Sequence, residues 1–581
     1  MFQIIRDLIF KALKQFAGSQ DICHLEESVL LDIPTDRSFG DLYTNAAMFF
    51  AKQLGVAPRV LAASISIALE ECDIILSTSI AGPGFININV KNEFWHEFID
   101  EILTKKGGYS ETNIKHGETI NVEFVSANPT GPLHTGHARN AVFGSVASNL
   151  LEKIGYTVTR EFYINDQGNQ IKALAKSLYL RYLEILGSDI PDDAFGDDMY
   201  CGEYIKDLAG CLFETYNDSF INKKESEYLD ILKEFSVNKM MENIKEDLEL
   251  LGITMDKYTS EADLFKRKIP DEVMEILSER GDTYEGVLPR PKGIDDDDEW
   301  EERPQTLFRS MKYGDSMDRA IRKSDGTWTY FAGDMAYHLD KIKRGYSKMV
   351  TVLGADHSGY VKRLKAAVHA LSDGTADIEI RLYQLVNFLE NGKPIRMSKR
   401  SGNFISLRDV VDKVGKDVTR YMMISRHHDV MIDFDFEKVI ECSMDNPLFY
   451  IQYAYARICS VLRHYANSFG ALNEEEVRNS DKGVLSDVAE LNLLKTLSFW
   501  PERVRSAALA IEPHRIPGYL QEVAYYFHAL WNVGKKNAEL RFISPDNRTE
   551  TISRLSLLMA TKIVLEDGLK IMGITPMSEM K

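Results

Sequence analysis

The sequence predicts a multidomain α/β protein, in which a doubly wound parallel sheet with a helical insertion lies between an N-terminal α+β domain and a C-terminal all-α helical bundle. Three observations support this prediction. The chain has 581 residues, too many for one ordinary core, which suggests about three or four domains. Strand-like and helix-like patterns alternate between residues 118 and 410, as in parallel sheets. From residue 444 onward the apolar spacing is almost wholly helical, which predicts an antiparallel bundle.

The N-terminal region, residues 1–112, is predicted to be a compact α+β domain. Helical spacing runs over residues 1–16 and around residues 42–54. Residues 81–84 contain two glycines and a proline and lead into the alternating segment 85–90, which predicts a turn that feeds a strand. We therefore expect a small mixed domain ahead of the main sheet.

The central domain is predicted to span residues 113–410. Its strand-like runs are residues 120–125, 158–164, 349–353 and 378–385. Between the second and third runs lies a largely helical insertion, at about residues 172–288, which is rich in Leu, Lys and Glu. Residues 411–443 are expected to form a connecting segment, and residues 444–581 the helical bundle.

The formal net charge of −19 at first argues against a nucleic-acid partner, because phosphate binding rests on Lys and Arg. The charge is unevenly distributed, however. Residues 451–581 contain 16 Lys plus Arg and 15 Asp plus Glu, a net of +1, so the remaining residues carry −20. The C-terminal region is thus the least acidic large part of the chain, and the overall charge does not exclude RNA binding there.

Composition also bears on metals and on location. The acidic run at residues 295–302 is predicted to be a solvated loop, because consecutive carboxylates rarely converge on one ion. The six cysteines are scattered without a Cys-x-x-Cys pair, so no disulfide framework and no zinc site is indicated, and no protein-bound metal is predicted. No apolar run approaches the roughly 20 residues that span a bilayer. Residues 1–18 mix charged and apolar residues as an amphipathic helix does, unlike a signal peptide, so we expect a cytoplasmic protein with no membrane partner.

The most informative segment, residues 127–137, reads Ala-Asn-Pro-Thr-Gly-Pro-Leu-His-Thr-Gly-His. It lies between a strand pattern and a helix pattern, so His134 and His137 are predicted to open a helix. A helix N-terminus offers unpaired N–H groups to an anion, and Gly131 and Gly136 let the backbone approach that anion closely. The segment therefore predicts a phosphate site.

A second segment, residues 396–403, reads Arg-Met-Ser-Lys-Arg-Ser-Gly-Asn and stands roughly 260 residues downstream. It follows a turn that contains Asn391 and Gly392 and precedes a helix pattern at residues 407–414, so a basic loop is predicted. A basic turn by itself is more often simply solvated. Its position after the first segment gives it more weight.

Together the two segments resemble the signatures His-Ile-Gly-His and Lys-Met-Ser-Lys-Ser of the class I aminoacyl-tRNA synthetases. The resemblance implies that the imidazoles stabilise the α-phosphate and that Lys399 holds the β and γ phosphates of ATP as pyrophosphate separates. Arg396 and Arg400 depart from the second signature, since a planar guanidinium does not present the point charge of an ammonium. The implied catalytic residues are His134, His137 and Lys399. The implied ATP-binding residues are Gly131, Pro132, His134, Gly136, His137, Arg396, Met397, Ser398 and Lys399.

Within this class, the order of features resembles the arginine-specific family. It runs from an extra N-terminal domain through residues 123–129 and 138–139 to residues 354–357, which read Gly-Ala-Asp-His, and then to the helical tail. Cysteine-specific enzymes normally use a zinc site with cysteine ligands, which this sequence does not indicate. The valine, leucine and isoleucine enzymes carry large editing insertions, for which a chain of 581 residues leaves no room. The resemblance implies a Rossmann-like catalytic domain that uses ATP with Mg²⁺ to attach L-arginine to its cognate tRNA through an arginyl adenylate.

Arginine presents a planar cation with five donors, so its pocket needs carboxylates in suitable positions. By the resemblance, Asp334 binds the guanidinium and Tyr330 flanks it. Glu123 would add a second acceptor, while Ser126 and Asn128 would hold the α-amino and carboxylate groups. The alternative interpretation is that Glu123 and Asp334 are ordinary cap or surface carboxylates.

The resemblance also implies tRNA contacts in both flanking domains. Phe85 and Asn87 would contact the tRNA elbow, although Phe85 could equally be a core residue and Asn87 a turn residue. The candidates in the bundle are Arg457, Lys535, Lys536 and Arg541. A monomer is the working expectation, and whether tRNA must bind before arginine is activated stays open.

Two other functions remain to be weighed. A nucleotidyltransferase could use the same His signature on a small acid without RNA, but a helical tail of about 130 residues argues against it. A non-catalytic tRNA-binding relative is the second alternative. The intact His134, His137 and Lys399 argue against that one.

Overall fold

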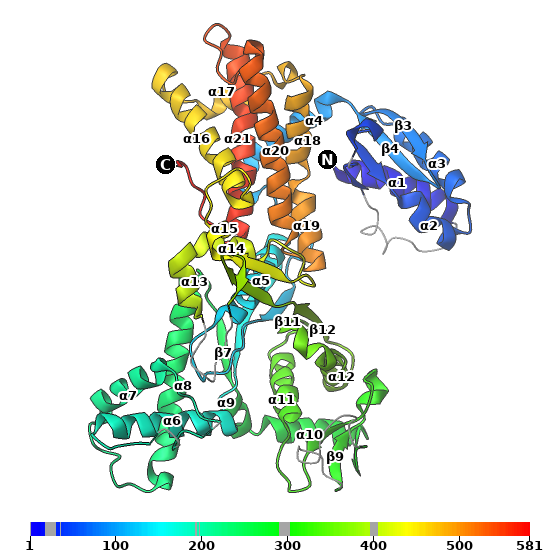
Figure 1. Cartoon of the computed structure of the whole chain (residues 1–581). Coiled ribbons are helices and arrows are strands. Elements are labelled where there is room, and N and C mark those ends of the chain that lie inside the picture. The colour runs from blue at the N-terminus through cyan, green and yellow to red at the C-terminus, as the bar shows by residue number, and fades with distance from the viewer. Residues whose placement is uncertain are drawn as a thin grey trace.

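The computed structural model describes residues 2–17, 31–34, 36–191, 194–196, 198–289, 303–395 and 405–580. A central α/β domain connects the other parts of the molecule (Figure 1). In that view the C-terminal helical bundle stands above the central sheet, the N-terminal domain lies beside the bundle, and a helical insertion extends below. This arrangement confirms the predicted multidomain α/β architecture with a parallel sheet.

The N-terminal domain is built on a four-stranded antiparallel sheet in the order β1-β2-β4-β3. Its elements are α1 (Phe2–Ala17), β1 (Leu31–Asp32), η2 (Arg37–Phe39), β2 (Leu42–Thr44), α2 (Ala46–Leu54), α3 (Pro58–Glu70), β3 (Ile75–Ala81), β4 (Phe85–Val90), α4 (Asn92–Lys105) and η3 (Lys106–Gly108). The helix predicted around residues 42–54 is wrong at its start, since residues 42–44 pair with β4 as a strand. Leu42 and Thr44 are buried on one face, and a pattern of three residues is too short to separate strand from helix.

The central domain contains a sheet of five parallel strands in the order β12-β11-β5-β6-β7. These strands are β5 (Thr119–Glu123), β6 (Thr157–Ile164), β7 (Lys257–Ser260), β11 (Lys348–Gly354) and β12 (Asp377–Tyr383). The chain moves outward from β5 through β6 to β7 and then returns to the other side of β5 at β11. The topological switch point therefore lies between β5 and β11, where ligands bind at the carboxyl ends of the strands.

Strand β7 corrects the sequence prediction, which placed it inside a largely helical insertion at residues 172–288. The insertion's long helices are α6 (Asn169–Ile185), α7 (Glu203–Tyr216) and α8 (Glu225–Leu250). The chain then returns to the sheet as β7, and α9 (Glu261–Lys266), α10 (Ile269–Glu279) and β8 (Thr283–Gly286) follow. A strand of four residues shows too little alternation to be recognised between strong helix patterns.

Helices flank the sheet. They include α5 (Thr135–Lys153), α11 (Tyr330–Lys343) and α12 (Val361–Ser372), and η6 (Ala355–Tyr360) precedes α12. Helix α5 packs tightly against the end of β5, because a Cβ atom on Gly144 would lie 2.1 Å from Phe124 Cγ. Two smaller sheets complete the domain, one of β8, β9 (Gln305–Phe308) and β10 (Arg319–Arg322), the other of β13 (Val386–Glu390), β14 (Lys393–Pro394) and β15 (Ile432–Asp435). The remaining elements are η5 (Ser310–Tyr313), α13 (Leu407–Val414), α14 (Lys416–Met423) and α15 (Phe436–Val439).

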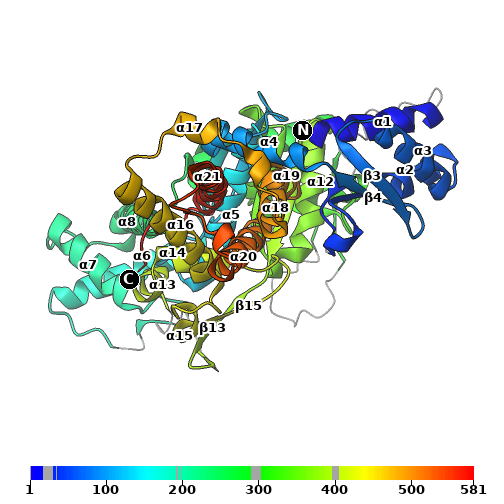
Figure 2. The same ribbon diagram turned by 90° about the horizontal axis from the view of Figure 1, so that it is seen from above.

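The C-terminal bundle has long helices that Figure 2 shows from above, with the N-terminal domain extending to one side. Its elements are α16 (Pro447–Phe469), α17 (Glu474–Arg478), η7 (Lys482–Val484), α18 (Val488–Ser498), α19 (Trp500–Ala510), α20 (Arg515–Lys536), η8 (Ala538–Leu540) and α21 (Arg548–Ile571). Ion pairs fasten the N-terminal domain to α19: Arg6 lies 2.6 Å from Glu502, and Arg503 lies 2.6 Å from Asp32. Among the described residues, no helix combines the length and the apolar character that a membrane crossing requires.

Candidate active site

The chain leaves β5 through a strained turn at the switch point of the sheet. Val125 and Ser126 have φ values of 69° and 40°, a left-handed conformation that is costly for side chains other than glycine and most of all for a β-branched valine. Asn140, in α5, holds this turn. Its Oδ1 accepts a hydrogen bond from Val125 N at 2.7 Å, and its Nδ2 donates to Val352 O at 3.0 Å. Asn140 therefore connects β5, α5 and β11 where a ligand is expected.

The His signature begins α5, as the sequence predicts. His134 is the N-cap residue: its Nδ1 accepts from Gly136 N at 3.0 Å, and its backbone N donates to His137 Nδ1 at 3.3 Å. The two imidazole rings are stacked, with centroids 3.9 Å apart. A Cβ atom on Gly136 would lie 2.7 Å from His134 Cε1, so only glycine lets the ring lie over the first turn. Both rings are partly exposed at a helix N-terminus, which favours an anion.

The segment that follows the second signature pairs with the first signature. His134 and Ser406 form an antiparallel bridge, and Leu407 N donates to Leu133 O at 2.8 Å. Ser406 and Leu407, which follow the second signature, therefore lie directly beside the start of α5. The predicted ATP-binding residues Arg396, Met397, Ser398 and Lys399, together with Arg400 and the acidic run 295–302, lie outside the described residues.

A buried carboxylate from the insertion joins these two segments. Asp247, in α8, is 2% exposed; its Oδ2 accepts from Leu133 N at 3.2 Å, and its Oδ1 accepts from Arg408 Nη2 at 3.2 Å. Burial raises the pKa of Asp247 above its ordinary value, against the opposing effect of the Arg408 guanidinium. One side chain therefore holds both the loop before the His pair and the helix after the basic loop.

Gly131, predicted to let the backbone approach a phosphate, is covered by an aromatic ring. A Cβ atom on Gly131 would lie 3.1 Å from Tyr204 Cζ, and Tyr204 Oη donates to Thr130 O at 2.9 Å. Gly131 is buried, whereas Pro132 is partly exposed. A ligand would therefore reach Gly131 only if Tyr204, in α7 of the insertion, moved aside.

Two carboxyl groups beside the carboxyl ends of the strands have unusual pKa values. Asp334, the fifth residue of α11, accepts a hydrogen bond from Tyr360 Oη, yet burial and repulsion from Glu123 raise its pKa to about 7. Glu261 follows β7 directly and is 7% exposed; burial and repulsion from Asp334 raise its pKa to about 7 as well. A Cβ atom on Gly333 would lie 2.6 Å from Glu261 Oε1, so Glu261 faces α11 beside Asp334. Such a pair suits a cation that forms several hydrogen bonds.

Glu123, the other predicted acceptor, already has partners within the protein. Its Oε2 accepts from Lys341 Nζ at 2.7 Å, and its Oε1 accepts from Ser126 Oγ at 3.1 Å. Lys341 is fully buried, so this ion pair is shielded from water. Glu123 lies close enough to raise the pKa of Asp334, but Glu261 is the better placed second acceptor for an external cation.

The remaining predicted contacts, Asn128 and Tyr330, lie on the open side of the site. Asn128 Nδ2 donates to Gln170 Oε1 at 2.8 Å. Tyr330 is the first residue of α11 and is 65% exposed, and a Cβ atom on Gly168 would lie 3.7 Å from its hydroxyl. The structure thus brings the His pair, Ser126, Asn128, Tyr330 and Asp334 to one edge of the sheet.

Sequence reasoning missed several residues of this edge. They are Asn140, Asp247, Glu261 and Tyr360. The sequence offered one indication of Glu261, which directly follows the aromatic and β-branched residues of β7 at the end of a strand. That strand was not recognised in the sequence, so the indication was missed. Asp247 had none, since its partners are more than 100 residues away along the chain.

The residues predicted to contact RNA occupy two places. In the N-terminal domain, Phe85 is partly exposed, whereas Asn87 is 8% exposed within β4. In the bundle, the Arg457 guanidinium lies 4.0 Å from the ring centroid of Tyr453 and 4.9 Å from that of Trp531. Arg457 therefore belongs to an aromatic cluster between α16 and α20.

The same cluster borders a cavity of about 790 Å³. Trp531, Lys535 and Arg541 line this cavity together with Phe469, which is 45% exposed. Lys536 is exposed on the same turn of α20. Aromatic faces combined with Lys and Arg are typical of sites that bind unpaired bases.

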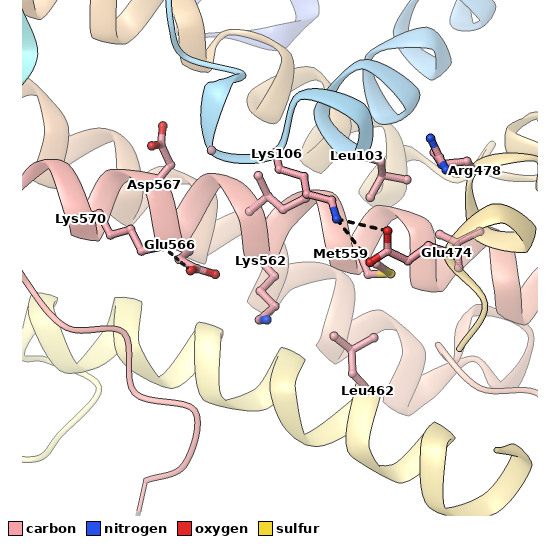
Figure 3. Close-up of a pocket in the computed structure, with 13 residues that line it drawn as sticks. Leu103, Lys106, Leu462, Glu474, Arg478, Met559, Lys562, Glu566, Asp567 and Lys570 are labelled. Atoms are coloured by element: carbon pink, nitrogen blue, oxygen red, sulfur yellow. Dashed lines mark hydrogen bonds and ion pairs between the residues drawn. The ribbon is translucent and has the colours of Figure 1, made fainter. Parts of the chain in front are cut away.

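A separate cavity of about 360 Å³ lies where η3 of the N-terminal domain meets α16, α17 and α21 of the bundle (Figure 3). Its apolar side chains include Leu103, Leu462, Met559 and Ile563. The charges at its rim pair with one another: Lys106 lies 3.1 Å from Glu474, and Lys570 lies 2.6 Å from Glu566. We assign this cavity no part in the chemistry at the sheet.

The chain is similar to proteins of known activity along its whole length. Three family models match it: the arginyl tRNA synthetase N terminal domain over residues 3–90, the catalytic domain of class I tRNA synthetases (R) over residues 98–281, and the DALR anticodon binding domain over residues 451–580. An arginine–tRNA ligase from Parvibaculum lavamentivorans is 48% identical over 554 residues, covering 95% of this chain and 94% of that protein. One from Wolbachia pipientis wMel is 46% identical over 580 residues, with 100% of both covered. Arginyl-tRNA synthetase from Thermus thermophilus, at 18% identity, shares the fold with a TM-score of 0.73 over 100% of both chains.

Proposed function

The chain belongs to the arginyl-tRNA synthetase family, and from this membership we propose which of its residues bind arginine, ATP and tRNA. As a class I enzyme of this family, it uses ATP to attach arginine to tRNA. The observation that carries the residue assignments is that the His pair at the start of α5 and the Asp334 and Glu261 carboxylates lie along the same edge of the sheet, where its parallel strands end.

Arginine would bind with its guanidinium between Asp334 and Glu261 and with the ring of Tyr330 over its stem. Two carboxylates that repel each other gain most from a planar cation with several donors, because each carboxylate can accept hydrogen bonds from the guanidinium fork. Glu123 would hold Ser126, which with Asn128 would orient the α-amino and carboxylate groups. Direct contact of Glu123 with the substrate stays a prediction.

ATP, accompanied by Mg²⁺ as part of the substrate, would place its α-phosphate at the N-terminus of α5. His134 and His137 would stabilise the charge that grows there as the arginine carboxylate attacks, and Lys399 would hold the departing pyrophosphate. Gly131, Pro132, Gly136, Arg396, Met397 and Ser398 would complete the nucleotide site. Catalysis would consist of positioning and charge stabilisation, with an arginyl adenylate as the intermediate.

The tRNA would reach from the N-terminal domain to the bundle. Phe85 and Asn87 would contact its elbow. Because the side chain of Asn87 is only 8% exposed, its contact would be made through the small part that reaches the surface of the sheet. Arg457, Lys535, Lys536 and Arg541 would contact the anticodon end, which the large cavity beside Trp531 supports. The domain limits at residues 112, 410 and 443, a monomeric state and a cytoplasmic location belong to the same proposal.

An ATP–pyrophosphate exchange assay with each proteinogenic amino acid, with and without tRNA, tests this function. We expect exchange with arginine alone among the amino acids, and we expect it to require tRNA, since the altered first position Arg396 is compatible with an active site that tRNA completes. Robust exchange without RNA would contradict the tRNA requirement and leave the enzyme class intact. Exchange with a different amino acid would contradict the assignment of the pocket.

The pKa values of the two carboxylates predict how arginine binding depends on pH. Because both pKa values are raised to about 7, both groups take up protons as the pH falls below that value and lose their attraction for the guanidinium. The KM for arginine should therefore rise about 10-fold per pH unit below pH 7 for one carboxylate, and more steeply for two. Steady-state exchange measured from about pH 8 to about pH 6 checks this, with the KM for ATP as the internal control. A KM for arginine that stays constant over this range would contradict the prediction.

A further inference from the structure

A cluster of histidines lies where the central domain meets the lower end of the C-terminal bundle, near α14 and α19 (Figure 1). His427 and His428 come from the loop between α14 and β15, and His514 comes from the turn between α19 and α20. The ring centroid of His427 lies 4.1 Å from that of His428 and 4.8 Å from that of His514. Nothing in the proposed reaction uses these side chains.

Three side chains of this cluster bring donor atoms together. One ligand atom from each of His427, Glu512 and His514 lies within 4.8 Å of the other two. His427 Nε2 is 3.7 Å from Glu512 Oε1. The second oxygen, Glu512 Oε2, accepts from Arg515 Nε at 2.5 Å, which leaves Oε1 on the side of the histidines. Two imidazoles and one carboxylate are a ligand set that zinc takes in proteins, with a water molecule as fourth ligand.

Unpartnered ring nitrogens also suit a metal ion. Among the described residues, His428 Nδ1 and His514 Nδ1 are buried without a hydrogen-bond partner, and His428 is 8% exposed. An imidazole nitrogen without a partner can offer its lone pair to a metal ion, and Arg515 holds the Glu512 carboxylate in place beside the rings.

We propose that His427, Glu512 and His514 bind one divalent transition-metal ion of the zinc class. Imidazole ligands favour such ions over Mg²⁺ and Ca²⁺. In the metal-free arrangement, Asp429 N donates to His427 Nδ1 at 3.3 Å. Binding at Nε2 puts the ring proton on Nδ1 instead, 3.5 Å from Asp429 Oδ2, which gives the carboxylate–histidine–metal arrangement found at many sites.

A second group of donors shares His427 but fits less well. His427, His428 and Asp429 also lie within 4.8 Å of one another. They are consecutive residues, however, and the Asp429 side chain is 69% exposed, so water competes for it. The group with Glu512 and His514 joins two separate segments and encloses the ion better.

The loop that carries His427 is held in place from the catalytic side. Arg139, two residues after His137, donates to His427 O at 2.9 Å and to Val430 O at 2.8 Å. Gln384 N donates to His428 O at 2.8 Å. A metal ion at this site would therefore cross-link the bundle to a loop that is bonded to the signature helix α5.

Metal binding is tested on the tag-free, full-length enzyme after chelator treatment, by titration with Co²⁺ and then Zn²⁺. We expect about one Co²⁺ per chain with the visible absorption of a tetrahedral site, displaced by Zn²⁺. His514→Ala should weaken Co²⁺ binding by at least about 100-fold, and Asp429→Asn, which alters only the partner of His427, by about 10–100-fold. His116→Ala, at an exposed histidine, is the matched control and should bind as the wild type does.

Each other outcome decides against the site. No stoichiometric Co²⁺, or equal affinity in His514→Ala and His116→Ala, overturns the proposal. Loss of binding in His428→Ala with retention in His514→Ala assigns the ion to the consecutive residues and also overturns it. If His514→Ala fails to fold, as judged by circular dichroism, Glu512→Gln carries the test, because it changes a ligand that the group of consecutive residues lacks.

Discussion

Replacement of Asp334 by asparagine is expected to remove most of the enzyme's preference for arginine over citrulline. Citrulline has nearly the shape of arginine but carries a neutral urea, so it would turn an oxygen toward the carboxylates in place of a pair of donors. A site built on such hydrogen bonds rejects the mismatched analogue by on the order of 10⁴ in kcat/KM, whereas shape alone gives only about 10–200-fold per methylene. Asp334→Asn should therefore lower kcat/KM for arginine strongly and narrow the difference in kcat/KM between arginine and citrulline.

The measurement is activation of both amino acids by wild type, Asp334→Asn and Glu261→Gln. The Glu261 variant should narrow the preference as well, since both carboxylates are proposed to share the guanidinium. Asp377→Asn, an exposed carboxylate at the start of β12, is the matched control and should change neither value. An Asp334→Asn enzyme that keeps the wild-type preference would show that Asp334 is not the specificity carboxylate, and Glu123 would become the next candidate.

Lys399→Ala should slow adenylate formation by about 10²–10³, the loss typical when one charge-stabilising donor is removed. The expected cause is that negative charge grows on the pyrophosphate as the bond to the α-phosphate breaks, and an ammonium on a long stem can follow it. Arginine affinity should change little, because the proposed guanidinium site is built from α11 and the start of α9. Single-turnover activation under saturating ATP measures the effect.

The control for this prediction is Lys393→Ala, an exposed lysine on β14 of the preceding hairpin. It removes the same charge from a nearby position that the proposal leaves without a role. Equal rates for Lys399→Ala and the wild type would mean that the second signature is not catalytic in this enzyme. Equal losses in both variants would mean that general charge near the loop matters, and not Lys399 itself.

Local features of the site were predictable because neighbouring residues determine them. The opening of α5 at His134 depends on capping within four residues and on the absence of a side chain at Gly136, and both are visible in the sequence. The helix predicted at residues 407–414 coincides with α13 for a similar reason, since Ser406 and Asp409 form a capping box. The assignments of Asp334 and Tyr330 came from the family resemblance and remain to be tested by mutation.

What the sequence by itself determined is therefore the family, the layer architecture and the local geometry of the His signature, because periodicity, capping and glycine placement act over a few residues. Tertiary structure alone decided the rest. It set Glu261 beside Asp334, joined both signature regions through Asp247, and brought His514 to His427. These contacts link segments tens to hundreds of residues apart, and they form only when the burial of whole helices and strands selects one packing. The sequence around a carboxylate or an imidazole does not indicate which distant residue this packing will bring into contact with it.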